Sequence, residues 1–166
     1  MILVYILSAV ILAVSLILQS HPSFDAIRFA GVKPDLSFIA IIYFSYSFGS
    51  FYGQTCAFIT GIFQDANSNS PLGLMTLPKV LIAFFAGFVG RSVFQGSSFT
   101  IILIIFVASL LKGGLTLIFA LIFNDASVAS LLHIVLPESV YNAVIAMPLF
   151  FIYDKIFEFE LSKERY

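Results

Sequence analysis

Five charged side chains could carry chemistry because they lie inside or beside long apolar stretches: Asp35, Asp65, Lys79, Lys112 and Glu138. A charged group near hydrocarbon is costly unless it is hydrated, paired or protonated, and such groups often mark functional sites. Lys112, in "ASLLKGGLTL", is the most costly of them, at about 2.5–3.5 kcal/mol for a central position before any compensation. Two interpretations of Lys112 stay open. Either its role is structural, because it snorkels to the interface or pairs with a buried acid, or it takes part in the assembly with other chains.

Asp65 ends a charge-free stretch and has three structural interpretations. It marks the point where a helix leaves the membrane, it caps the following turn, or it pairs with Lys79 across the loop. A proton or ion relay is disfavoured, because no deeper carboxylate and no helix-lining histidine accompany Asp65. Glu138 directly follows Pro137, and proline favours the first position of a helix, so we assign Glu138 to the capping of a helix start.

Motifs of enzymes and metal sites are missing from the sequence. It has no paired-aspartate motif for magnesium and a lipid diphosphate, no His-Glu-x-x-His, no Gly-x-Ser-x-Gly and no phosphate-binding glycine loop. The single cysteine, Cys56, lies in an apolar run without the spacing of a zinc site. We therefore expect no enzymatic activity, no metal and no cofactor.

Composition is typical of an integral membrane protein. The chain has 166 residues, of which 60% are hydrophobic and 10% charged, and its mean hydropathy is +1.06. The net charge of −1 provides no basic surface for nucleic acid. The expected surroundings are therefore the lipid bilayer, and no nucleic-acid partner is expected.

The apolar runs predict an all-α membrane protein, a bundle of about six transmembrane helices in one domain, residues 1–166. Residues 36–64 carry no charge. One helix of that length would be about 43 Å long, too long for a hydrocarbon core of about 30 Å, and the stretch is too short for two full spans. A turn within residues 45–50 therefore predicts a tight hairpin of two short helices. If both termini are cytoplasmic, four Lys or Arg residues near the helix ends lie on the inner side and three on the outer side. Positive residues favour the inner side, so this count favours cytoplasmic termini. The predicted helices are residues 2–18, 36–48, 50–64, 74–93, 99–123 and 137–153, followed by a short charged tail, 154–166.

Small residues recur at four-residue steps from the predicted turn into the third predicted helix, at Gly49, Gly53, Ala57 and Gly61. A four-residue step advances 400° around a helix, so these positions form a slanted strip without bulk. In a bilayer such a strip lets helix backbones approach, because helices there associate by close packing. Packing against the chain's own helices and docking of a different chain both remain open. The same spacing recurs in the first helix, at Ala9 and Ala13.

Lys33 to Gly90 resembles the central part of the MreD family of rod shape-determining membrane proteins, and "LPESVYNAVIAMPLFFIYD" is similar to the closing helix of that family. In the turn at residues 47–51, the chain lacks the basic residues that many relatives carry. The shared features, in chain order, are Pro34 and Asp35 before a helix, the turn glycines Gly49 and Gly53, "GIFQD" at Gly61–Asp65, and "PLG" ending at Gly73.

The resemblance implies a non-enzymatic scaffold subunit of the bacterial inner membrane that takes part in cell-wall elongation. Its expected partners are MreC foremost, then the glycosyltransferase RodA, a penicillin-binding transpeptidase and, indirectly, the actin-like MreB. On this interpretation the small-residue strip and the lone polar residues organise helices for partner docking. Asp35, Asp65 and Lys79 would lie near the outer face.

A second function stays open. Small six-helix proteins with a glycine-rich hairpin also resemble the substrate-binding subunits of energy-coupling-factor vitamin transporters, in which Ala-x-x-x-Ala on the first helix faces the transport partner. Ala9 and Ala13 have that spacing. Such a subunit needs a polar, aromatic ligand pocket at the outer face, and the short loops and the lack of Trp argue against one.

Overall fold

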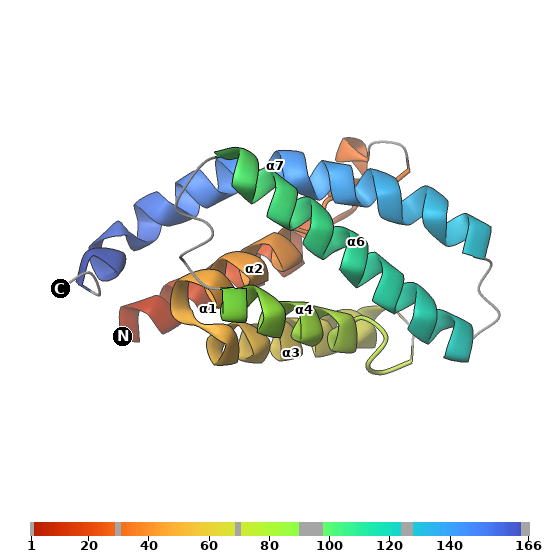
Figure 1. Ribbon diagram of the computed structural model, residues 1–166, viewed down its shortest axis with the longest axis horizontal. Helices are drawn as coiled ribbons and strands as arrows, with labels where there is room; N and C mark the ends of the chain where they lie inside the picture. Colours follow the sequence, from red (N-terminus) through yellow and green to blue (C-terminus); the bar gives the residue numbers. More distant parts are fainter. Residues whose placement is uncertain (1, 29–30, 69–70, 90–97, 124–127, 164–166) are drawn as a thin grey trace.

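The computed structural model describes residues 2–28, 31–68, 71–89, 98–123 and 128–163 (Figure 1). Within these ranges the chain forms six α-helices and one short 3-10 helix. An all-α membrane fold is thereby confirmed. The elements are α1 (Ile2–Ser20), η1 (Pro22–Ile27), α2 (Leu36–Phe48), α3 (Ser50–Asn67), α4 (Thr76–Val89), α6 (Ser98–Phe123) and α7 (Val128–Lys163).

Helix α2 is the centre of the bundle. Ten of its 13 residues are buried, and it contacts α1, α3, α4 and α7. Figure 1 shows α6 and α7 crossing one side of the molecule, with α1, α3 and α4 on the other side. A helix that is apolar on all sides needs neighbours on all sides, and the two layers provide them.

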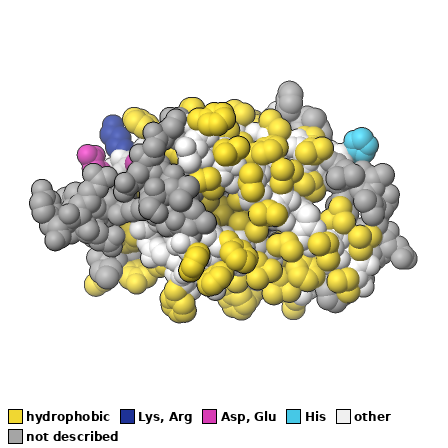
Figure 2. All heavy atoms as spheres, viewed as in Figure 1, with side chains coloured by type: hydrophobic (Ala, Val, Ile, Leu, Met, Phe, Trp, Pro, Cys, Tyr) yellow, Lys and Arg dark blue, Asp and Glu magenta, His cyan; other side chains and the backbone are white. Residues whose placement is uncertain are grey.

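The helices differ in how much of a membrane they can cross. Three stretches are long and apolar enough to span it: Ile2–Ser20, Phe99–Ile122 and His133–Glu158. At 1.5 Å per residue, α2 and α4 are only about 20 Å long, short of the roughly 30 Å of hydrocarbon. Much of the face over α4 and α6 is hydrophobic, as expected of a surface in contact with lipid (Figure 2).

Helices α2 and α3 form a hairpin that turns at Gly49. This residue has a φ of 96°, a conformation that glycine adopts without strain. Its N–H donates to the carbonyl of Ser45 and so closes the end of α2. The turn needs a single residue, and the two helices therefore pack directly against each other.

Helix α7 differs from the prediction. The sequence favoured a helix start at Pro137 and a helix end at Tyr153, but α7 is continuous from Val128 to Lys163, with Pro137 and Pro148 inside it. The predicted capping role of Glu138 is therefore wrong. Proline is tolerated within membrane helices because neighbouring groups satisfy the freed backbone carbonyl. Residues 90–93 and 164–166, predicted for the fourth helix and the tail, lie outside the described residues.

Candidate functional site: a buried charge cluster

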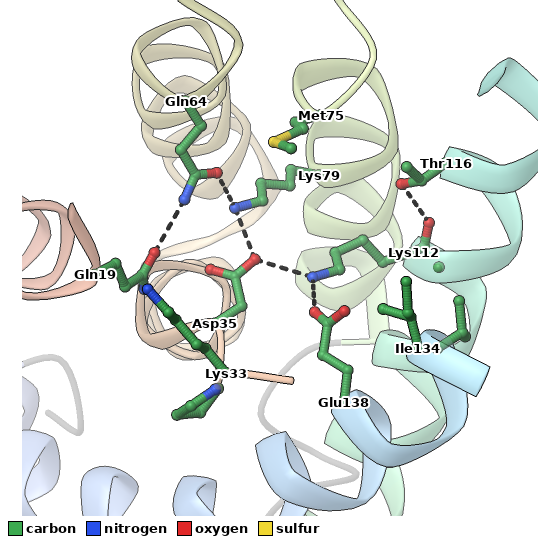
Figure 3. Close-up of a pocket in the computed structure, with 13 residues that line it drawn as sticks. Gln19, Lys33, Asp35, Gln64, Met75, Lys79, Lys112, Thr116, Ile134 and Glu138 are labelled. Atoms are coloured by element: carbon green, nitrogen blue, oxygen red, sulfur yellow. Dashed lines mark hydrogen bonds and ion pairs between the residues drawn. The ribbon is translucent and has the colours of Figure 1, made fainter. Parts of the chain in front are cut away.

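Four buried or half-buried charges meet where α2 begins, and we call them the charge cluster: Asp35, Lys79, Lys112 and Glu138 (Figure 3). Asp35 Oδ2 lies 2.8 Å from Lys79 Nζ and 2.9 Å from Lys112 Nζ. Lys112 Nζ also lies 2.5 Å from Glu138 Oε1. The cluster thus joins the start of α2 to α4, α6 and α7, and pairing with buried acids accounts for the lysine in the middle of α6.

Asp35 has a second task as the N-cap of α2. Its Oδ1 accepts hydrogen bonds from the backbone N–H of Phe38, at 3.0 Å, and from the hydroxyl of Ser37, at 2.8 Å. Such a cap satisfies N–H groups that the first turn of a helix leaves unpaired. One carboxylate therefore caps the central helix with one oxygen and binds two ammonium groups with the other.

The charges fix the protonation state of Asp35. Burial by itself raises the pKa of this carboxyl group, because it disfavours the charged form. The ammonium groups of Lys112 and Lys79 outweigh burial and hold the pKa of Asp35 well below its usual range. Asp35 is therefore ionised at neutral pH.

All three N–H bonds of the Lys79 ammonium group have an acceptor. Besides Asp35, its ammonium group donates to the hydroxyl of Ser37, at 3.2 Å, and to the amide oxygen of Gln64. These three acceptors match the three N–H bonds of a lysine. The Gln64 amide nitrogen lies 3.1 Å from the side-chain amide of Gln19, and this contact connects α3 to the end of α1.

Lys112 is less fully bound than Lys79. Its two hydrogen bonds go to Asp35 and Glu138, and its ammonium lies 4.8 Å from the centroid of the Phe38 ring. A cation over an aromatic face is favourable, and more so where water is excluded. Next to it, a side chain on Gly113 would collide with Val135 of α7, so the missing side chain lets α6 and α7 approach at this level.

Sequence reasoning missed Asn142, which is fully buried on α7. Its Oδ1 accepts a 2.7 Å hydrogen bond from the backbone N–H of Asp35, and its Nδ2 donates to Ser109 of α6 at 3.2 Å. Asn142 therefore positions the backbone of the residue that holds the cluster together. A lone amide within an apolar helix is the signal that could have revealed it.

A pocket of about 330 Å³ adjoins the charge cluster. This volume lies at the lower end of the range for small-molecule sites. Polar groups converge on one part of its wall, and apolar side chains form another part (Figure 3). The lining residues are Gln19, Lys33, Pro34, Asp35, Gln64, Met75, Lys79, Lys112, Gly113, Thr116, Ile134, Val135 and Glu138.

Asp65 lies outside the charge cluster and organises the loop before α4. Its two oxygens accept backbone N–H groups from Gly73, Met75 and Thr76, at 2.8, 2.8 and 3.3 Å, and Oδ2 also accepts the hydroxyl of Thr76 at 2.5 Å. Gly73 has a φ of 102°, which suits this turn. Of the three interpretations of Asp65, capping describes its contacts, whereas the carboxylate beside Lys79 is Asp35.

The small-residue strip of α3 faces the chain's own helices. A Cβ on Gly53 would lie 2.6 Å from the Cα of Ser45 in α2, and one on Gly61 would lie 2.6 Å from the Cα of Thr76 in α4. Ala57, between them, is fully buried. At these three positions the strip thus lets α3 pack tightly on two neighbours, whereas Gly49 lies in the turn before α3 and a Cβ there would meet nothing within 4 Å.

Ala9 and Ala13 on α1 are different, because both are exposed. Only four of the 19 residues of α1 are buried, all on the opposite stripe of the helix. The outward stripe also carries large apolar side chains such as Val10 and Val14. This face of α1 is therefore covered by nothing within the described part of the chain.

Comparison with known proteins gives one match. The family model described as MreD, rod shape-determining protein MreD, matches residues 1–159. The chain belongs to the MreD family. Membership in the MreD family implies a role in determining rod shape, and it agrees with the membrane-spanning helices.

No curated protein and no solved structure matches the chain. The likeness to substrate-binding subunits of energy-coupling-factor transporters therefore stays a prediction. MreD proteins are described as shape-determining proteins and not by a reaction. Within the described residues, no three His, Cys, Asp or Glu side chains are grouped so that they could hold a metal ion.

Proposed function

We propose that this MreD-family chain is a non-catalytic scaffold of the cell-wall elongation machinery in the bacterial inner membrane. It contributes to peptidoglycan synthesis by holding partner proteins through helix–helix contacts, with MreC as the first partner. RodA, a penicillin-binding transpeptidase and, indirectly, MreB complete the assembly. Support comes from the family match and from the uncovered face of α1.

The face of α1 has the properties that a partner helix needs. Ala9 and Ala13 are exposed and four residues apart, so they form a stretch of low bulk beside larger exposed apolar side chains such as Val10 and Val14. Membrane helices associate where such small residues let backbones approach. The internal strip at Gly53 and Gly61 is already filled by α2 and α4, so we assign the docking contact to the small residues of α1.

Copurification with MreC tests this role of α1. Replacing Ala9 and Ala13 together by Leu adds bulk where a partner backbone would approach, and we expect recovery of MreC to fall several-fold while the thermal stability of the purified protein is unchanged. Val10→Leu with Val14→Leu is the matched control, because it adds bulk to neighbouring exposed positions of the same helix. Undiminished MreC recovery and normal cell shape with the alanine variant would reject the proposal.

The orientation belongs to the same proposal. With both termini in the cytoplasm, the end of α1 and the charge cluster lie toward the outer face, where cell-wall synthesis takes place. Single cysteines placed at Ser20 and at Glu158, in a background without Cys56, report this directly. We expect an impermeant thiol reagent applied to intact spheroplasts to label position 20 and not position 158, and the reverse pattern would invert the topology.

A solute-binding subunit of a vitamin transporter remains the second candidate, favoured by the pocket beside the charge cluster. The described lining of that pocket has no aromatic side chain on which a vitamin ring could stack. Retention of a radiolabelled vitamin by the purified protein would support the transporter. Spherical cells after depletion would support the scaffold.

A further inference from the structure

The wall of the pocket offers one cationic donor and one anionic acceptor side by side. Lys112 uses two of its three N–H bonds, and within the described part of the chain no hydrogen bond engages the second carboxylate oxygen of Glu138. The side chains are 10% and 21% exposed, and both line the pocket. A bound molecule can therefore accept from Lys112 and donate to Glu138 at the same time.

The charge of the site favours a ligand without net charge. Asp35 and Glu138 contribute two negative charges and Lys79 and Lys112 two positive ones, so the charge cluster is neutral. Lys33 also lines the pocket, but its ammonium group is engaged elsewhere, 5.9 Å from the centroid of the Phe24 ring. A ligand with an acidic group and an ammonium group satisfies the open positions without leaving a buried charge unpaired.

Part of the remaining wall is apolar. Met75, Ile134 and Val135 line the pocket together with the polar groups. In Figure 3 Met75 lies beside Lys79 and Ile134 beside Lys112. Neither a bare ion nor a small polar solute gains from this surface, whereas an amphiphile places its apolar part there. The lining thus matches a molecule with a zwitterionic head and an apolar continuation.

The short helices beside the pocket allow membrane lipids to approach it. Helices α2 and α4 begin beside the pocket, and both are too short to cross the hydrocarbon. Short helices thin the bilayer or draw polar groups inward around them. In Figure 1 the end of α6 and the start of α7 extend beyond α3 and α4. The pocket is lined by Lys112, Gly113 and Thr116, several residues before α6 ends at Phe123.

From these observations we propose that the pocket binds the headgroup of a zwitterionic phospholipid of the phosphatidylethanolamine type. The phosphate lies against the ammonium group of Lys112, and the ethanolammonium donates to Glu138. The glycerol end of the lipid contacts Ile134 and Met75. The scaffold would thereby carry a specific lipid as part of its structure.

Binding of defined lipids to the delipidated, full-length protein tests the proposal by native mass spectrometry. We expect phosphatidylethanolamine to bind about tenfold or more tightly than phosphatidylcholine, whose quaternary ammonium has no N–H to donate. Phosphatidylglycerol, which lacks the ammonium group, should also bind more weakly. Equal affinity for the three lipids would overturn the proposal. Free phosphoethanolamine that competes as well as the lipid would also overturn it, because the ligand would then be a soluble headgroup.

Two variants locate the binding. Ile134→Trp fills the pocket from its apolar side without touching the charges, and we expect it to abolish the preference for phosphatidylethanolamine. Ile152→Trp is the matched control, since Ile152 is about equally exposed on the same helix and does not line the pocket. Glu138→Gln retains the shape of the site but not its charge, and it should bring the affinity for phosphatidylethanolamine down to that for phosphatidylcholine. Unchanged lipid preference in Ile134→Trp would show that the lipid binds elsewhere and would refute the assignment.

Discussion

The two ends of the central helix α2 are held in different ways. At its start, Asp35 caps the helix and binds two ammonium groups. Toward its end, aromatic rings surround it: Tyr43 lies 5.1 Å from the ring centroid of Phe150, and Phe44 lies 5.9 Å from that of Phe157. The first end depends on a few directed bonds, and the second depends on many weak contacts between rings.

In this protein the two ends of α2 contribute differently to the placement of the helices. Directed bonds between buried charges fail when a single partner is removed, because the other charge is left without compensation. Ring contacts are individually weak and adapt to changes of shape. The charge cluster therefore specifies one arrangement of helices, while the aromatic end supplies tolerant packing.

Asp35→Asn should produce the largest effect. It removes the shared counter-charge of Lys79 and Lys112, and breaking a buried ion pair typically costs about 3–5 kcal/mol. Unfolding in mixed detergent micelles measures the loss. Asp154→Asn is the matched control, because Asn can still accept the 2.9 Å hydrogen bond of Tyr43 at the aromatic end. Equal losses in the two variants would remove the distinction between the ends.

Gly53→Ala should rank second. Its added Cβ collides with the backbone of Ser45 in α2, and overpacking of this kind costs about 1–3 kcal/mol. Gly114→Ala in α6 serves as the control, since a Cβ there meets nothing within 4 Å. The control should be neutral or slightly stabilising, as alanine favours a helix by up to about 1 kcal/mol. A neutral Gly53→Ala would contradict the close contact between α2 and α3.

Phe157→Leu should cost about 1 kcal/mol, less than the change at Asp35 although Phe157 is fully buried. Leucine keeps most of the volume, and the neighbouring rings of Tyr43, Phe44 and Phe48 can adjust to it. The same unfolding experiment gives the value. A loss above that of Asp35→Asn would show that the aromatic end, and not the charge cluster, specifies the packing.

Tyr43→Phe should have the smallest effect of the four. It keeps the ring and removes only the hydrogen bond to Asp154. Because Asp154 is exposed, water can replace the lost donor, and the cost should be only about 0.5 kcal/mol. Its cost should also disappear in the Asp154→Ala background, where the acceptor is already gone. A cost that persists there would mean that the hydroxyl group acts through another partner.

The sequence contains enough to predict the membrane class and the helical fold, because both depend on long apolar runs that need no knowledge of neighbours. The turn at Gly49 follows from chain length, since 29 uncharged residues fit neither one span nor two. Capping by Asp65 is one of the interpretations that the sequence allows, because the capped N–H groups lie in the loop that immediately follows Asp65.

The charge cluster could not be predicted because its members are far apart in the chain. Asp35 and Lys112 are separated by 77 positions, and no local pattern indicates which lysine an acid will meet. Glu138 was misassigned for a related reason: Pro137 is a strong local signal for a helix start, and tertiary packing overrode it. Asn142 gave a local signal, a buried amide among apolar residues, but its partners are equally remote.

The proline at position 148 has a mechanical consequence. It lies on α7 between Glu138, which belongs to the charge cluster, and Asp154, which binds Tyr43. Because proline cannot donate to the carbonyl one turn earlier, a helix bends most easily there. The charge cluster and the aromatic end of the bundle are therefore connected through a helix that bends most easily between them, so small shifts at one end need not displace the other.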